Sequence, residues 1–133
     1  MITAQDAIEA LRKAVEARGG DFVYESPMPY SRCVYVDDNM VPSCGVGVAL
    51  SLLGWTPSDL AVLDRGEDEL GVGANVLHTN ADHLENSDLM VDRDAALVFG
   101  RFQEFQDEGT PWGESLDHAE REYRRITTTE KED

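Results

Sequence analysis

The chain has few basic residues, and this shortage excludes several classes of partner. Of its 133 residues, 27 are Asp or Glu and 11 are Lys or Arg, which gives a formal net charge of -16. A field of this sign repels nucleic acids, anionic membranes and phosphorylated substrates, and it attracts cations and basic protein surfaces. We therefore expect neither direct nucleic-acid binding nor membrane binding.

The chain also lacks an export signal and a long apolar run. Residues 1–6 have no basic start and no apolar core of the kind that a signal peptide requires. The uncharged stretch 39–58 is interrupted by proline and glycine, and its apolar centre is too short to span a membrane. These features predict a cytoplasmic protein, in which Cys33 and Cys44 stay reduced rather than forming a disulfide.

Capping residues and apolar spacing predict a mainly helical α+β fold. Thr3 and Asp6 form a capping-box pattern, and Gly19-Gly20 ends the first helix. Further helices are predicted over 44–53, 56–64, 92–108 and 110–126. Ser43 can cap the first of these, and the other three begin with their caps, Thr56, Asp92 and Thr110. Two short β-prone runs within 22–36 predict a small antiparallel hairpin.

The helix predicted over 44–53, with Ser43 as its cap, is apolar on nearly every side. Such a helix is typical of the centre of a domain, so we expect about five helices to pack round it. Gly45 and Gly47 each cost about 1 kcal/mol of helix propensity relative to Ala. This cost indicates that another element approaches the helix closely at these positions.

The last predicted helix carries a narrow apolar seam at alternating spacings of four and three residues: Trp112, Leu116, Ala119, Tyr123 and Ile126. Such a seam packs against another helix, within the chain or across a dimer. The apolar face of the helix predicted over 92–108 favours the first option, and therefore a monomer. Trp112 is interpreted as a staple at the corner between the two helices.

Residues 1–126 are predicted to form one globular domain, followed by a frayed polar tail at 127–133. Within the domain, residues 64–91 have weak periodicity and form what we call the acidic segment. It is either solubilising surface or a docking surface for a basic partner, and its single basic residue favours docking. The residues expected to bind the partner are Asp64, Glu67, Asp68, Glu69, Asp82, Glu85 and Asp88.

Cys44 is the one candidate for catalysis. A thiol in the first turn of a helix is activated by the positive helix terminus, but a nucleophile also needs a base. The spacing does not show that His78, His83 or His118 reaches it. The alternative is that Cys44 is a small buried packing residue.

Metal and cofactor signals are weak. His78, Asp82 and His83 would offer two nitrogens and a carboxylate to zinc, but their segment lacks a helical pattern. The order of acids after Asp64 does not match an EF-hand, and neither Gly-x-Gly run continues into a phosphate loop. We therefore expect no cofactor.

Two pieces of the chain resemble a family. The helix-start motif is Cys44-Gly45-Val46-Gly47-Val48-Ala49-Leu50 with Leu53-Gly54, and the corner motif is Gln103-Glu104-Phe105-Gln106-Asp107-Glu108-Gly109-Thr110-Pro111-Trp112-Gly113. Together they are similar to small, acidic, mostly helical proteins of actinobacteria and their bacteriophages. The resemblance implies a phage or actinobacterial origin and supplies no catalytic residue.

Two functions remain open. The first is a non-enzymatic interaction protein that engages a basic surface of a host protein, as an inhibitor or as a mimic of nucleic acid. If the chain is phage-encoded, it would act in the host cytoplasm. The second is a small thiol-dependent enzyme or redox protein that uses Cys44.

Overall fold

The computed structural model describes residues 1–25, 35, 37, 39–61 and 90–131, and within these residues the chain is mainly helical. The helices are α1 (Ala4–Arg18), α2 (Gly45–Leu52), α5 (Arg93–Asp107) and α6 (Trp112–Lys131). Residues 57–61 form a further helical turn. None of the described helices combines the length and apolarity that crossing a bilayer requires.

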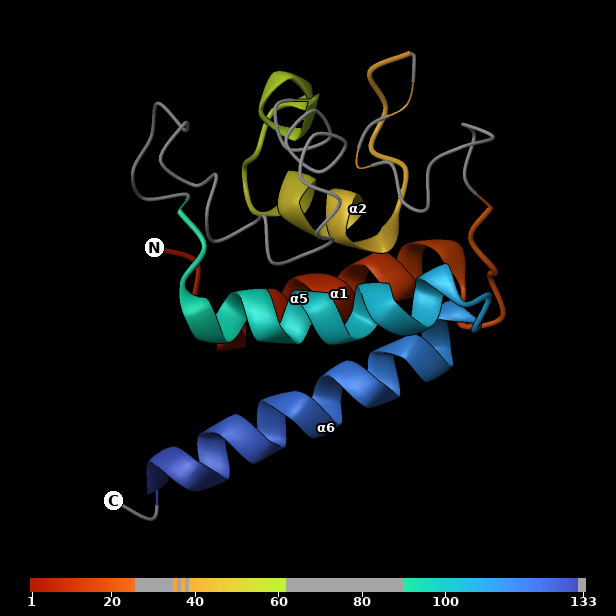
Figure 1. Cartoon of the computed structure of the whole chain (residues 1–133). Coiled ribbons are helices and arrows are strands. Elements are labelled where there is room, and N and C mark those ends of the chain that lie inside the picture. The colour runs from red at the N-terminus through yellow and green to blue at the C-terminus, as the bar shows by residue number, and fades with distance from the viewer. Residues whose placement is uncertain (26–34, 36, 38, 62–89, 132–133) are drawn as a thin grey trace.

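Helices α1 and α5 lie side by side and run in the same direction, as Figure 1 shows. A parallel bridge between Ile2 and Val91 aligns their starts. The Ile2 N–H donates to the Met90 carbonyl at 2.7 Å, and the Asp92 N–H donates to the Ile2 carbonyl at 3.0 Å. Segments far apart in the sequence are thereby held in register just before both helices begin.

The described helices form three layers, with α1 and α5 in the middle. Helix α2 packs on one side of this pair and α6 on the other (Figure 1). The prediction that helix 44–53 is the centre is therefore wrong for the described helices, because α1 and α5 each contact the other three. Leu52, the last residue of α2, is 54% exposed, whereas Gly45, Val46, Gly47, Ala49 and Leu50 are buried.

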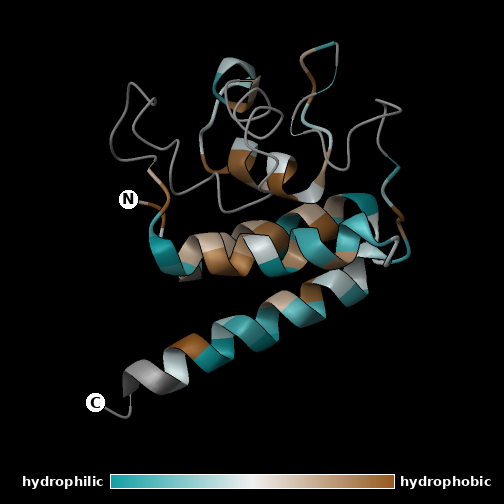
Figure 2. Ribbon diagram, viewed as in Figure 1, coloured by the Kyte–Doolittle hydropathy of each residue, from teal (hydrophilic) through white to brown (hydrophobic). Residues whose placement is uncertain are grey.

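The core lies between the layers. Its largest fully buried side chains include Trp112, Tyr35, Phe99 and Phe102. Figure 2 shows that α6 is hydrophilic over most of its surface. Its predicted seam faces inward: Trp112, Ala119 and Ile126 are buried, and Leu116 and Tyr123 pack against the core. The seam therefore pairs within the chain, as predicted.

Three predicted helix caps are confirmed, one is corrected, and α6 begins at Trp112 rather than directly after the predicted cap Thr110. Thr3 and Asp6 form the capping box of α1, Thr56 and Asp59 make the same pair of bonds, and Asp92 caps α5. The cap of α2 is Cys44, not Ser43, because the Cys44 sulfur accepts the Gly47 N–H at 3.4 Å. Helix α2 consequently starts at Gly45.

The end of α6 extends beyond the predicted helix, and only part of the predicted hairpin lies within the described residues. Helix α6 continues to Lys131, so residues 127–131 are helical where a frayed tail was expected. The Thr127 hydroxyl donates to the Tyr123 carbonyl at 3.0 Å, which keeps this last part bonded to the preceding turn. Residues 22–25 form no strand, and most of the predicted hairpin (22–36) lies outside the described residues.

Candidate functional site

Cys44 lies at the junction between the α2 layer and the middle layer. Its side chain is fully buried and its thiol is free of any disulfide. The sulfur accepts the Gly47 N–H and so acts as a helix cap. His118, a base considered for this thiol, instead stacks on Phe105 with ring centroids 3.6 Å apart and planes 8° apart. This arrangement gives Cys44 a structural role.

Gly45 and Gly47 allow Phe102 and Tyr35 to approach α2 closely, as the presence of two glycines in this helix predicted. A Cβ atom on Gly45 would lie 2.2 Å from the Phe102 ring. A Cβ atom on Gly47 would lie 2.2 Å from the Tyr35 carbonyl oxygen. The chain therefore needs glycine at both positions, because a side chain at either would occupy space already filled.

The helix-start motif and the corner motif meet in the structure. The Gly45 N–H, at the start of α2, donates to the Gln106 side-chain oxygen on α5 at 2.8 Å. The Tyr35 hydroxyl donates to the Gln103 side-chain oxygen at 3.0 Å, also in the interior. The helix-start motif and the corner motif are therefore two sides of one buried contact, and this contact explains both without any catalytic chemistry.

Sequence reasoning missed these two glutamines as buried polar residues. Phe99, Phe102, Gln103 and Gln106 follow the i, i+3, i+4, i+7 spacing of one helix face, and all four are buried. A glutamine in such a pattern needs a hydrogen-bond partner in the interior. The spacing of the two glutamines relative to Phe99 and Phe102 could therefore have predicted their burial.

Trp112 is the structural staple that the sequence indicated. It is fully buried and packs edge-on against Phe22 and Phe102, with ring centroids 4.7 Å and 5.9 Å away. The backbone N–H of Trp112 donates to the Phe22 carbonyl at 2.8 Å, and the backbone N–H of Gly113 donates to the Gly20 carbonyl at 2.9 Å. The corner motif is thereby fastened to the residues that follow α1.

Arg18 covers the rings of Phe22 and Trp112 on their solvent side. Its guanidinium carbon lies 5.3 Å from the Phe22 ring centroid and 5.5 Å from that of Trp112. The same guanidinium donates to the Pro42 carbonyl at 3.4 Å. An exposed arginine thus joins the end of α1, the corner and the segment before α2.

The predicted partner-binding and metal-binding residues lie outside the part of the chain that the structure describes. Asp64, Glu67, Asp68, Glu69, Asp82, Glu85 and Asp88, together with His78 and His83, lie outside the described residues, as does Cys33. Within the described part of the chain, no three His, Cys, Asp or Glu side chains form a group that could hold a metal ion.

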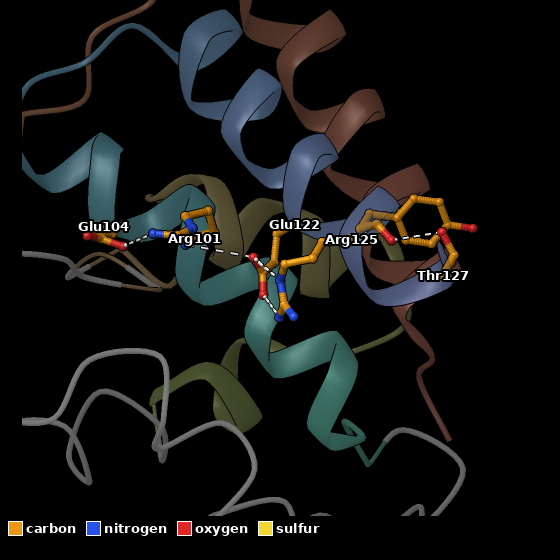
Figure 3. A network of polar contacts seen from close by, with 6 residues as sticks. Arg101, Glu104, Glu122, Arg125 and Thr127 are labelled. Atoms are coloured by element: carbon orange, nitrogen blue, oxygen red, sulfur yellow. Dashed lines mark hydrogen bonds and ion pairs between the residues drawn. The ribbon is translucent and has the colours of Figure 1, made fainter. Parts of the chain in front are cut away.

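An ion-pair network joins α5 to α6 (Figure 3). The Glu122 carboxylate is buried and accepts two hydrogen bonds from Arg125, at 2.5 and 3.2 Å, while Arg101 of α5 lies 3.7 Å away. Arg101 also pairs with Glu104 at 3.2 Å. The hydrogen bond from Arg125 lowers the pKa of Glu122, burial opposes this shift, and the charges of Arg125 and Arg101 add to it. The Arg101–Glu122 pair of this network links α5 to α6.

A half-open cavity of about 340 Å³ lies where α1 and α5 start and α6 passes them. One of the two acidic groups in its wall already has a structural role. Asp92 caps α5 through the Ala95 N–H at 2.7 Å. The lining residues are Thr3, Ala4, Gln5, Asp92, Asp94, Tyr123, Ile126 and Thr127.

Comparison with known proteins adds no identity. No protein-family model matches the sequence, no curated protein matches it, and no solved structure matches its fold.

Proposed function

We propose that this chain is a small non-enzymatic interaction protein, encoded by a bacteriophage, that binds a basic surface of a host protein in the host cytoplasm. The observation that carries the proposal is the concentration of charge between Thr56 and Asp92, where nine acidic residues accompany Arg65 as the single basic residue. A surface of one sign steers a partner of the opposite sign and speeds its association.

The expected partner is a protein whose surface is basic because it binds nucleic acid or another polyanion. A segment rich in Asp and Glu carries the same sign of charge as a phosphate backbone. Occupying that surface would inhibit the partner by exclusion. The binding residues proposed are those of the acidic segment: Asp64, Glu67, Asp68, Glu69, Asp82, Glu85 and Asp88.

The second candidate, a thiol enzyme using Cys44, has less support. A nucleophilic thiol must be accessible to its substrate and must have a base within hydrogen-bond reach. Cys44 is fully buried, and its sulfur accepts a hydrogen bond from the backbone of its own helix. These contacts favour a capping and packing role.

The proposal is tested by affinity capture from an actinobacterial lysate at low and high salt, with three baits. The first is the wild-type chain. The second has the seven proposed binding acids changed to Asn or Gln, which brings the net charge from -16 to -9. The third is a matched control with seven exposed acids neutralised elsewhere, to the same net charge: Glu9, Glu16, Asp21, Glu25, Glu108, Glu114 and Asp117.

The comparison of the second and third baits separates a specific surface from general charge. We expect a host protein that the wild-type and control baits retain at low salt, that high salt releases, and that the second bait loses. Equal recovery by all three baits, or no recovery by any, would show that the charge is only solubilising. If both neutralised baits lose the host protein equally, the binding depends on net charge alone and not on the acidic segment.

A further inference from the structure

A tight turn before α2 presents two apolar side chains to solvent. The Asp37 N–H donates to the Val41 carbonyl at 2.9 Å, and the Met40 N–H donates to the Asp37 carbonyl at 3.0 Å. The Asp37 carboxylate accepts the N–H groups of Asn39 and Val41 at 2.8 and 3.0 Å. In Figure 1 this turn (orange) lies on the α2 side of the molecule, opposite α6.

The two residues at the end of this turn are apolar and exposed. Met40 is 46% exposed and its neighbour Val41 is 49% exposed. Four hydrogen bonds hold the backbone that carries them, so this backbone is ordered before any partner arrives. A site that is already ordered loses less conformational entropy on binding than a flexible one.

Met40 also has an unfavourable backbone conformation. Its φ is 62°, and it is the one non-glycine residue with positive φ in the described part of the chain. Glycine or asparagine adopts this conformation more easily than methionine does. Strain of this kind at an exposed position points to a role for the side chain itself.

We infer that Met40 and Val41 form an apolar anchor, which inserts into an apolar recess within the basic surface of the partner. This inference rests on the proposed function and adds a second contact to it. The anchor follows two acids, Asp37 and Asp38, in a chain of net charge -16, so a recess bordered by basic residues complements it. Methionine suits such a role, since its unbranched side chain adapts to an irregular pocket.

The first test uses the free protein and the variant Met40→Asn. Asparagine tolerates positive φ and removes the apolar side chain. We expect the midpoint of thermal unfolding to equal or exceed that of the wild type by a few degrees, because the strain is relieved. A midpoint several degrees lower would show that Met40 packs within its own chain, and that result would overturn the anchor.

The second test measures binding of the host protein that the wild-type bait retains from the actinobacterial lysate at low salt. Met40→Asn and Val41→Ser should each weaken its binding about 10- to 100-fold, the loss expected for one buried apolar side chain. Met40→Leu, which keeps the apolar character, should retain most of the affinity. The matched control is Leu52→Ser, at an apolar residue that is 54% exposed on α2, and it should change little.

The outcomes separate this inference from the proposed function. Loss of binding on neutralising the acidic segment, with Met40→Asn and Val41→Ser unchanged, would overturn the anchor and leave the proposed function in place. Equal losses for both anchor variants and for Leu52→Ser would also overturn it, since the effect would not depend on the turn. A wild-type bait that retains no protein overturns both.

Discussion

Replacing Gly47 by alanine tests the close contact on which the helix-start motif depends. The new Cβ atom would lie 2.2 Å from the Tyr35 carbonyl oxygen and 2.9 Å from its carbonyl carbon and Cα. Because these are backbone atoms, a rotamer change cannot relieve the overlap. The Tyr35 carbonyl also accepts the Ser43 N–H at 3.0 Å, so moving it disturbs the entry to α2.

Three opposing contributions set the size of the effect. Alanine gains about 1 kcal/mol over glycine in helix propensity. Overpacking in a filled interior costs about 1–3 kcal/mol, and the weakened Ser43 hydrogen bond costs about 1 kcal/mol more. The net expectation is a loss of about 1–3 kcal/mol in the free energy of unfolding, or about 4–12 °C in the unfolding midpoint of a chain of this size.

Thermal and urea unfolding of the Gly47→Ala variant provide the measurement. Ser51→Ala in the same helix is the control, and it should leave the midpoint unchanged or slightly raised. Gly113→Ala provides an intermediate case, because its Cβ would lie 3.0 Å from the Gly20 carbonyl oxygen. A Gly47→Ala variant as stable as the Ser51→Ala control would refute the close contact between α2 and Tyr35.

Three further predictions follow from the buried groups. In a Cys33→Ser background, iodoacetamide should alkylate native Cys44 at least about 100-fold more slowly than unfolded Cys44, because the thiol is fully buried; equal rates would restore the thiol-enzyme candidate. Gln106→Ala should lower the free energy of unfolding by about 1–3 kcal/mol, because the buried Gly45 N–H loses its acceptor; an unchanged urea midpoint would exclude this. The pKa of Glu122 is lower in the folded protein than in the unfolded chain. The Glu122 carboxylate should therefore stabilise the folded protein above the ordinary glutamate pKa of about 4.3, and this stabilisation should be lost as the pH falls through the pKa of Glu122 in the folded protein. Glu122→Gln should therefore cost about 1 kcal/mol at pH 7, a modest value because both arginines are partly solvated, and a difference that does not shrink under acid conditions would contradict the assignment.

The local features of this fold could be predicted from the sequence, and the long-range ones could not. The capping pairs at Thr3 and Thr56 were found because each partner lies three residues away. The glycines of α2 indicated a close approach, but the spacing could not name the approaching groups, since Phe102 lies on another helix. The apolar character of α2 predicted a central position, whereas α1 and α5 lie in the middle of the described helices, because composition does not show which helices contact one another.

The acidic residues of the described chain divide into two groups, and this division decides where the proposed function can be tested. One group is tied to backbone N–H groups or to arginines, and neutralising it would weaken the fold: Asp6, Asp37, Asp59, Asp92, Glu104, Glu120 and Glu122. A loss of binding there could not be separated from a loss of structure. The control bait therefore draws only on exposed acids outside this group. Because the control and the acidic-segment bait share one net charge, a difference in what they retain has to come from where the charges lie.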